Sequence, residues 1–411
     1  MRLLILSQYF WPESFIINDI VRLLDEQGHD VVVATGKPNY PDGKVFEGYR
    51  ASGTQRERYL NKVEVLRVPL WPRGKGGAKH LILNYLSFVL AGLLFLPWML
   101  RKREFDAIFV FAPSPVTQVI PAILLKYLKK AKLVLWIQDL WPESLAATGY
   151  IRNSNLLKGV GWMVRAIYSC SDTLLVQSRA FIEPVARFAE REKIFYYPNS
   201  IDIRPPVALL PIPSDLRELL ETHFCVVFAG NLGTAQALDT LVQAAVHLRD
   251  DPQIRLVLVG SGSRLAWLRA QQNTYGLDNL AIPGRFPMES MPQILERASA
   301  LLVSLSNEEA FAQTIPSKVQ AYLAAGKPII ASMNGEGARV VYEARAGLVS
   351  PAEQVLPLVA NIRRMKALGD LERKEMGDSG KAYFDVNFDM NRQAQVLVEY
   401  LVCKAGKGGC K

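Results

Sequence analysis

Hydrophobic runs of strand length alternate along the chain with apolar positions at helical spacing. The residues from Ile16 to Leu24 form one apolar helical stripe, and Gly28 is placed to end that helix. Strands are predicted in the first half at Arg2–Ser7, Asp30–Thr35, Val63–Val68, Asp106–Phe111, Lys132–Ile137 and Thr173–Val176. This alternation is typical of βα units around a parallel sheet.

The second half repeats the pattern, with strands predicted at Phe224–Ala229, Arg255–Val259, Leu301–Ser304 and Pro328–Ala331. At 411 residues the chain exceeds the roughly 250 to 300 residues at which one core usually splits. We therefore expect an α/β protein of two facing Rossmann-like domains with parallel sheets. The predicted parts are an N-terminal domain 1–197, a proline-rich linker 198–214, a C-terminal domain 215–385, and a helix with a flexible tail 386–411.

One segment, Leu81–Leu100, contains no charged residue over 20 positions, which is long enough for a helix to span a bilayer. It lies between two predicted strands of one sheet, so a single crossing would put those strands on opposite sides of the membrane. We favour a helix that lies in the membrane interface, against the alternatives of a buried helix and a true span. Cations and tryptophans that suit such an interface flank it, at Arg73, Lys75, Lys79, Arg101, Lys102, Arg103, Trp71 and Trp98.

Composition narrows the class of protein. The formal net charge of +9 favours an anionic partner such as phosphate or an anionic leaflet. The basic residues gather around the apolar segment and lack an aromatic-interleaved groove, so we expect no nucleic acid partner. The four cysteines have no metal-ligand spacing and there are only four histidines, so no metal site is expected, and a reduced cytoplasmic setting is favoured.

The tetrapeptide Trp-Pro-Glu-Ser occurs twice, at 11–14 and at 141–144, each time just after a predicted strand. Because ligands of open α/β sheets bind beyond the carboxyl ends of strands, both copies are candidates for one site. The candidate catalytic residues are Glu13, Asp139 and Glu143, with the tryptophan faces available to a sugar. The alternative is that Ser and Glu only cap the next helix.

In the second domain, Phe228-Ala-Gly-Asn-Leu-Gly-Thr-Ala-Gln236 and Val259-Gly-Ser-Gly262 each predict a strand, a glycine loop and a helix start. Such loops allow a phosphate to approach the backbone closely, and helix N-termini attract it. Neither matches the dinucleotide fingerprint or the P-loop, so each loop is weak support taken alone. Candidate donor-binding residues here are Gly230, Asn231, Gln236 and Gly260.

The segment Thr314–Ala331 predicts a short helix that begins near Pro316 and ends at Gly326, followed by a strand. Ser317 and Lys318 fall in its first turn. A fixed cation beside free backbone N–H groups suits a diphosphate, although a lysine at a helix start is often only solvated.

These residues resemble the large family 4 of retaining glycosyltransferases, which have the GT-B fold. The resemblance covers nearly the whole chain and rests on Pro198-Asn199-Ser200-Ile-Asp202, Phe228-Ala-Gly230, Val259-Gly-Ser-Gly262 and Leu323-Ala-Ala-Gly-Lys-Pro-Ile-Ile330. The twin Trp-Pro-Glu-Ser loops and Pro316-Ser-Lys-Val-Gln320 are similar to the subgroup of O-antigen, capsule and colanic acid transferases. Close relatives are described as N-acetyl-L-fucosamine transferases.

The resemblance implies a UDP-sugar donor, an undecaprenyl-diphosphate-linked saccharide acceptor and work at the cytoplasmic face of the bacterial inner membrane, without a cofactor or metal. The family's usual Arg and Lys are Asn231 and Gln236 here, and its paired glutamates are Gln313 and Ala321. The diphosphate charge is then expected to fall to Lys318 and Arg285, and the sugar and ribose hydroxyls to Glu309, Gln313 and Glu336. The alternatives are a UDP-sugar 2-epimerase of the same fold and a non-catalytic subunit of an assembly complex.

Overall fold

The computed structural model describes residues 1–74, 77–147, 149, 153–204 and 208–402. The chain divides into unit 1, Met1–Asn199 with Met390–Lys411, and unit 2, Ser200–Asp389. The division after Asn199 falls inside the segment 198–214 that was predicted to be the linker. The predicted tail beyond residue 402, with Cys403 and Cys410, and the flanking cation Lys75 lie outside the described residues.

In its described part, unit 1 is built on one sheet with the strand order β3-β4-β2-β1-β5-β6-β7-β8. Its strands are β1 (Arg2–Leu6), β2 (Asp30–Thr35), β3 (Gln55–Tyr59), β4 (Val63–Arg67), β5 (Ala107–Ala112), β6 (Lys132–Ile137), β7 (Thr173–Val176) and β8 (Ile194–Tyr196). All pairs are parallel except β3 with β4, so the prediction of a parallel sheet holds apart from this edge hairpin. The sequence pattern missed β3 and β8.

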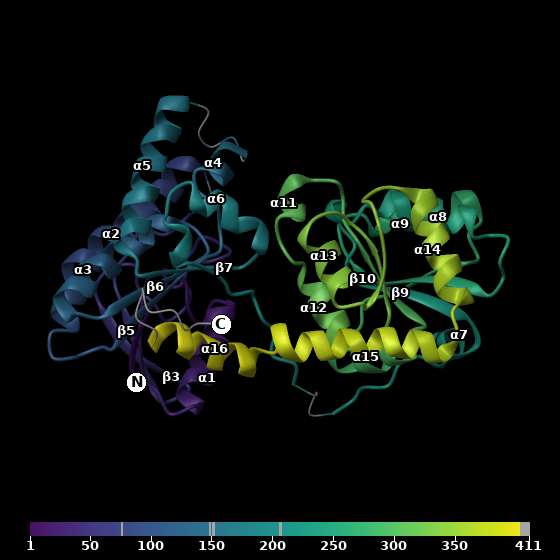
Figure 1. The fold of residues 1–411 in the computed structure, drawn as a ribbon, viewed down its shortest axis with the longest axis horizontal. Coiled ribbons are helices and arrows are strands. Elements are labelled where there is room, and N and C mark those ends of the chain that lie inside the picture. Colours follow the sequence, from purple (N-terminus) through teal and green to yellow (C-terminus); the bar gives the residue numbers. More distant parts are fainter. Residues whose placement is uncertain (75–76, 148, 150–152, 205–207, 403–411) are drawn as a thin grey trace. The chain divides into compact units, whose positions relative to one another are not determined.

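Helices cover both faces of this sheet (Figure 1). On one face, residues of α2, α3 and α5 join inward-facing strand residues in one apolar cluster, and on the other face α1 and α16 do the same. The helices of unit 1 are α1 (Ile16–Glu26), α2 (Ala78–Met99), α3 (Ile120–Lys129), α4 (Glu143–Ala147), α5 (Ser154–Cys170), α6 (Ile182–Ala186) and α16 (Met390–Val402).

The last helix, α16, belongs to unit 1 although the chain reaches it only after completing unit 2. Ala394 and Leu397 are fully buried in the cluster with α1. The Tyr197 hydroxyl donates to the Gln393 carbonyl (2.9 Å), and the Lys132 ammonium donates to the Tyr400 carbonyl (2.5 Å). The helix is therefore part of the core of unit 1.

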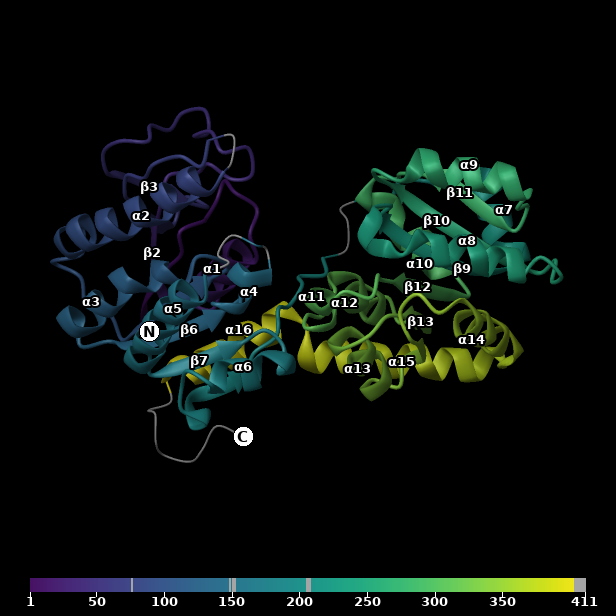
Figure 2. The ribbon, with the colours of Figure 1, turned by 90° about the horizontal axis from the view of Figure 1, so that it is seen from above.

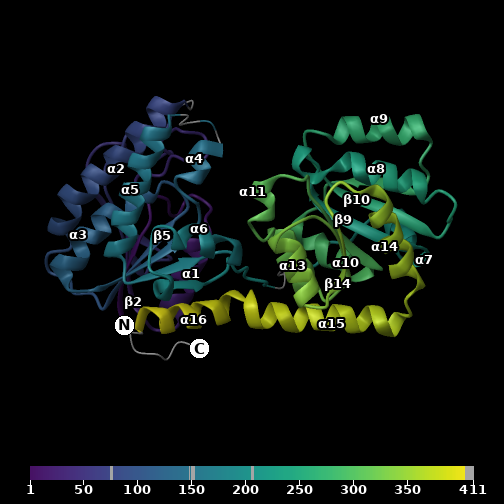
Figure 3. The same ribbon diagram turned by 45° about the horizontal axis from the view of Figure 1, so that its top comes forward.

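Unit 2 has, in its described part, a six-stranded parallel sheet of order β11-β10-β9-β12-β13-β14. The strands are β9 (Phe224–Asn231), β10 (Ile254–Ser261), β11 (Leu280–Gly284), β12 (Ala300–Ser304), β13 (Ile329–Ser332) and β14 (Gly347–Ser350). The helices are α7 (Ser214–Thr222), α8 (Leu238–His247), α9 (Leu265–Tyr275), α10 (Met291–Arg297), α11 (Glu309–Ala312), α12 (Ser317–Ala324), α13 (Glu336–Glu343), α14 (Val355–Ala367) and α15 (Asp370–Asn387). Helices α8, α9 and α14 pack on one face, and α7, α10, α12, α13 and α15 pack on the other (Figure 3).

The uncharged segment of the sequence forms α2, which packs beside α3 (Figure 2). Among the described residues it is the one helix long and apolar enough to cross a membrane, yet only 28% of its most apolar window is buried. The strands before and after it, β4 and β5, belong to the same sheet, which rules out a single crossing between them. The helix is thus neither a single crossing nor mostly buried, and its position in a membrane interface stays a prediction.

Candidate active site

Each sheet has one point where the strand order reverses, and ligands of open α/β sheets bind beyond the carboxyl ends of the strands at such points. In unit 1 the reversal lies between β1 and β5, and in unit 2 between β9 and β12. The twin Trp-Pro-Glu-Ser loops follow β1 and β6, and the glycine loops follow β9 and β10. The motifs chosen from sequence thus lie at the expected edge of each sheet.

A pocket of about 750 Å³ opens at this edge of unit 2. Its lining includes five of the predicted donor-binding residues: Gly230, Asn231, Gly260, Arg285 and Lys318. The opposite wall is apolar and was not predicted; it is formed by Phe286, Pro287, Met288, Met291 and Leu295. The pocket therefore combines a polar, glycine-rich floor with an apolar wall.

Lys318, on the first turn of α12, lies across the end of β9. Its ammonium group donates to Gln236 Oε1 (2.9 Å) and lies 3.5 Å from the centre of the Phe228 ring. A Cβ atom at Gly230 would lie 2.5 Å from Lys318 Cε and would displace the end of the lysine side chain, and the positive φ of Gly230 (140°) also favours glycine there. Burial lowers the pKa of Lys318 to about 7. The glycine at the end of β9 and the lysine of α12 thus form one structural feature.

Tyr322 holds this end of the pocket in place. It lies one helical turn after Lys318 on α12, is buried, and its hydroxyl accepts a hydrogen bond from the Ala229 backbone N–H (2.8 Å). The sequence reasoning missed Tyr322, although its spacing of four residues from Lys318 places both side chains on one face of a helix.

The remaining predicted donor-binding residues do not line this pocket. Gln236 contacts it only through Lys318, and Ser317 is exposed at the start of α12. Glu309 begins α11 and Gln313 directly follows it, and Gln313 Nε2 donates a long hydrogen bond to Glu309 Oε1 (3.4 Å). Glu336, at the start of α13, is buried and pairs with Arg339 (2.8 Å). Glu309 and Gln313 thus follow β12, and Glu336 follows β13.

In unit 1, Glu13 is a structural residue of the first loop. Its buried carboxylate accepts hydrogen bonds from the backbone N–H groups of Asn39 (2.8 Å), Tyr40 (2.8 Å) and Phe10 (3.2 Å). Burial raises the pKa of Glu13, and these three hydrogen bonds oppose the rise. A carboxylate committed to three amides holds the loop 39–40 in place, which is a different role from the catalytic one predicted. The capping alternative also fails here, because no side chain caps α1.

In the second loop, Asp139 faces a different environment. It accepts a hydrogen bond from Trp141 Nε1 (3.1 Å), and Ser114 and Ser144 also interact with it. Burial raises its pKa above the ordinary range of an aspartate. Trp141 is only 9% exposed, so its ring positions Asp139 and is not a face open to a sugar. Asp139 is the one carboxylate of the twin loops that combines partial burial with hydrogen-bonding side chains.

Glu143, the other carboxylate of the second loop, is the first residue of α4. Its partner is Arg187, at 3.7 Å, and its side chain is 38% exposed. A solvated ion pair of this kind contributes little to stability and leaves the carboxylate accessible.

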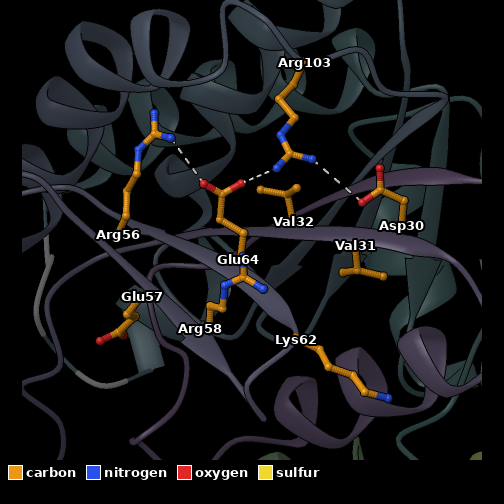
Figure 4. Close-up of a pocket in the computed structure, with 9 residues that line it drawn as sticks. All are labelled: Asp30, Val31, Val32, Arg56, Glu57, Arg58, Lys62, Glu64 and Arg103. Atoms are coloured by element: carbon orange, nitrogen blue, oxygen red, sulfur yellow. Dashed lines mark hydrogen bonds and ion pairs between the residues drawn. The ribbon is translucent and has the colours of Figure 1, made fainter.

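A second hollow, of about 410 Å³, lies at the opposite edge of the unit 1 sheet, where β2 and β4 begin (Figure 4). Glu64 stands between Arg56 (3.3 Å) and Arg103 (2.5 Å), and Arg56 also donates to the Met99 carbonyl (3.2 Å). These contacts connect the end of α2 to the edge hairpin. Because most of the charges that line it are already paired, we interpret this hollow as structural.

The described residues contain no group of three or more His, Cys, Asp or Glu side chains arranged to hold a metal ion. The expectation of a metal-independent enzyme stays a prediction.

Two family models match the chain. Residues 15–200 match a glycosyl transferase 4-like domain, and residues 217–383 match glycosyl transferases group 1. The chain is a GT-B glycosyltransferase. It is also 28% identical over 353 residues to WcaI of Escherichia coli K12, covering 79% of this chain and 82% of that protein, whose name describes a colanic acid biosynthesis glycosyl transferase.

Solved structures support the fold of this glycosyltransferase. A sucrose-phosphate synthase from Thermosynechococcus elongatus superposes with a TM-score of 0.67 at 17% identity, over 97% of this chain and 98% of that one. HepE of Anabaena, solved in complex with UDP, superposes with a TM-score of 0.66 at 14% identity, over 98% and 99%. At these identities the likeness shows the fold alone.

Proposed function

We propose that this glycosyltransferase moves a sugar from a UDP-sugar, held in the unit 2 pocket, to a saccharide carried on undecaprenyl diphosphate during the assembly of a bacterial surface polysaccharide. The observation that carries the donor part is the pocket itself, where Lys318 lies over a glycine-rich strand end beside an apolar wall.

The chemistry of the pocket matches the two ends of a nucleoside diphosphate. A base is flat and apolar on its faces, which suits the wall around Phe286 and Met288, while a diphosphate needs cations and N–H donors. Lys318 and Arg285 supply positive charge, and the glycines at the ends of β9 and β10 admit phosphate oxygens close to the backbone. The UDP complex of HepE, a protein of the same fold, supports a uridine nucleotide.

Transfer with retention then needs little beyond positioning and neutralisation of charge. The bond between the anomeric carbon and the phosphate oxygen breaks, and the acceptor oxygen bonds to that carbon on the same face. The acceptor proton passes to the departing diphosphate. Lys318 and Arg285 stabilise the charge that develops there without a metal ion, and Asp139 orients the acceptor.

The outer face of α2 supports a membrane-borne acceptor. Its exposed residues are all apolar over a long stripe, with exposures of 55% at Ile82, 66% at Leu90, 69% at Leu94 and 58% at Trp98. Arg101 and Lys102 follow the helix, and Lys79 lies in its first turn. Apolar side chains between cations are the composition of a helix that lies in an anionic leaflet. The protein would thus attach peripherally to the cytoplasmic face of the inner membrane.

The name of WcaI supports a role in colanic acid or a similar polysaccharide, and N-acetyl-L-fucosamine is our first candidate for the sugar. The test is a thermal-shift screen of the protein with UDP, GDP, dTDP and their N-acetylated deoxy-sugars, followed by transfer of a radiolabelled sugar to a lipid-linked acceptor. We expect UDP to raise the melting temperature more than GDP or dTDP. Equal shifts with all three nucleotides, or none, would overturn the assignment of the donor.

A further inference from the structure

Arg73 lies at the same edge of unit 1 as Asp139, just before α2 begins. Its guanidinium lies 5.3 Å from the centre of the Tyr40 ring and 5.9 Å from that of Tyr9. Its backbone N–H donates to Asn39 Oδ1 (3.1 Å), and Asn39 is fully buried. Among the residues that the structure describes, no carboxylate pairs with this guanidinium.

Hydrogen bonds hold in place the loop 39–40, which contacts Arg73. Glu13 binds the backbone of Asn39 and Tyr40, and Asn84 of α2 donates to the Trp71 carbonyl (2.6 Å) and accepts from Gln8 Nε2 (2.7 Å). Aromatic rings that cover the face of a guanidinium leave the N–H donors along its edge available. A positioned arginine without a carboxylate partner is suited to an anion, and its planar fork suits phosphate.

A line of polar side chains connects Arg73 to Asp139. Tyr85, on α2, interacts with Tyr9 and Ser114. Arg73 and Asp139 are both close enough for their charges to act on its hydroxyl group. Ser114, after β5, interacts in turn with Asp139. Tyr9, Ser114 and Asp139 lie in the loops that follow the neighbouring strands β1, β5 and β6, whereas Arg73 and Tyr85 belong to the segment after β4. One end of this line is therefore cationic, and the other carries a carboxylate.

Helix α2 joins this line to the apolar stripe. Tyr85 faces the polar edge. Ile82, about one helical turn before it, and Leu86, the residue after it, are exposed on the outer face. From Ile82 the stripe continues to Trp98, a rise of about 24 Å along the helix. A phosphate at Arg73 would thus sit where an attached hydrocarbon chain meets the start of the stripe.

We propose that Arg73 binds the diphosphate of a prenyl-diphosphate-linked acceptor, whose lipid chain runs along the outer face of α2 and whose sugar points toward Asp139. This inference rests on the lipid-linked acceptor proposed above, and it adds the residue that recognises the phosphate and the direction in which the acceptor lies. It makes Arg73, Tyr9 and Tyr85 acceptor-binding residues, whereas Lys318 serves the donor.

The test is a binding experiment on the full chain that needs neither the acceptor sugar nor turnover. Isothermal titration with dodecyl diphosphate, kept below its micelle concentration, compares the natural protein with Arg73→Ala, Arg73→Lys and the control Lys62→Ala. Lys62 is an exposed cation of unit 1 at the opposite edge of the sheet, where it pairs with Asp25. We expect Arg73→Ala to raise the Kd at least tenfold, Arg73→Lys to raise it less, and Lys62→Ala to change it less than twofold.

Two further ligands decide between explanations. Dodecyl maltoside has the same hydrocarbon chain without phosphate, and UDP has the diphosphate without the chain. The Kd of neither ligand should change in Arg73→Ala. If Arg73→Ala weakens UDP as strongly as dodecyl diphosphate, Arg73 belongs to the donor site and the proposal is wrong, although the proposed function stands. An unchanged Kd for dodecyl diphosphate in both Arg73 variants would also overturn it, and hydrogen exchange at β1 and β5 checks that unit 1 stays folded.

Discussion

Lys318 lies where burial works against its own charge. Its neighbours in the pocket are an amide oxygen, a ring face and glycine backbone, and none of them carries a full negative charge. A buried ammonium group without a counter-ion loses hydration free energy, which lowers its pKa. A bound diphosphate would supply the missing negative charge and would therefore stabilise the charged form of Lys318.

We therefore expect Lys318→Ala to lower kcat/KM by about 10- to 100-fold, because a charge-assisted hydrogen bond contributes roughly 1.5 to 3 kcal/mol. The measurement is transfer from a radiolabelled donor, with the UDP-induced thermal shift as a second readout. Lys374→Ala is the control, since Lys374 is an exposed lysine of unit 2 paired with Asp378. If both variants behave alike, Lys318 is not part of the donor site.

The same lysine predicts a pH dependence of donor binding. With a pKa of about 7 in the free protein, Lys318 loses its proton as the pH rises through neutrality. The bound diphosphate raises that pKa, so binding takes up a proton and the affinity falls above about pH 7. UDP titrations from pH 6 to 9 should show a rising Kd, while Lys318→Arg, which stays charged, should show a flatter profile. A profile that is the same in both proteins would remove the lysine as its cause.

At this scale the sequence predicted residues whose chemistry is local. Lys318 was predicted because a cation in the first turn of a helix can be recognised from spacing, and the structure places it in the lining of the unit 2 pocket. The position of Glu13 was predicted to be catalytic because its tetrapeptide repeats, but its partners are the amides of Asn39 and Tyr40, 26 and 27 residues away. The environment of Asp139 includes Ser114, which lies in the loop after another strand, β5. Partners brought together by the sheet cannot be read from either motif alone.

At the scale of elements, α2 has two different faces. Phe88 and Leu96 are fully buried against the sheet, whereas Leu90 and Leu94 are exposed. We expect Leu90→Glu combined with Leu94→Glu to abolish binding to vesicles of phosphatidylglycerol and phosphatidylethanolamine without unfolding the protein. The matched control is Leu356→Glu with Leu371→Glu, at similar exposures of 67% and 69% in unit 2. Retention of vesicle binding by the α2 variant in a flotation assay would contradict attachment through this face.

The packing of α2 on α3 depends on a close approach at Gly92. A Cβ atom there would lie 2.7 Å and 2.9 Å from two ring carbons of Pro121, whereas Gly159 of α5 has nothing within 4 Å. The same substitution should therefore have opposite effects. We expect Gly92→Ala to lower the free energy of unfolding in urea by about 1 kcal/mol through overpacking, and Gly159→Ala to raise it by about 0.4 to 1 kcal/mol. Equal effects would show that α2 can move away from α3 freely.

Helices and buried strands were predicted more fully than the strands at the edges of the sheets. The final helix was predicted within 386–411, and the structure places it at Met390–Val402. Strand β3 was missed because its sequence, Gln-Arg-Glu-Arg-Tyr, has only one apolar residue. As an edge strand it pairs through one side only, and its charged side chains form the ion pairs around Glu64 and Arg67. Hydrophobic periodicity detects buried strands and overlooks strands of this kind.

At the scale of the whole molecule, the chain begins unit 1, builds unit 2, and returns to complete unit 1. The returning helix α16 supplies fully buried side chains, so the stability of unit 1 depends on residues that follow unit 2 in sequence. Leu397→Ala should cost about 2 to 5 kcal/mol as a large-to-small change in this core, while Val402→Ala, at 59% exposure on the same helix, should be nearly neutral. Hydrogen exchange provides the measurement: in Leu397→Ala, β5, β6 and α1 should exchange faster, because α16 packs against them. Strands β9 and β10 of unit 2 should keep their protection, and UDP should bind as before. Faster exchange in β9 and β10 as well would mean that the two units unfold together, and α16 would then stabilise the whole enzyme rather than one half of it.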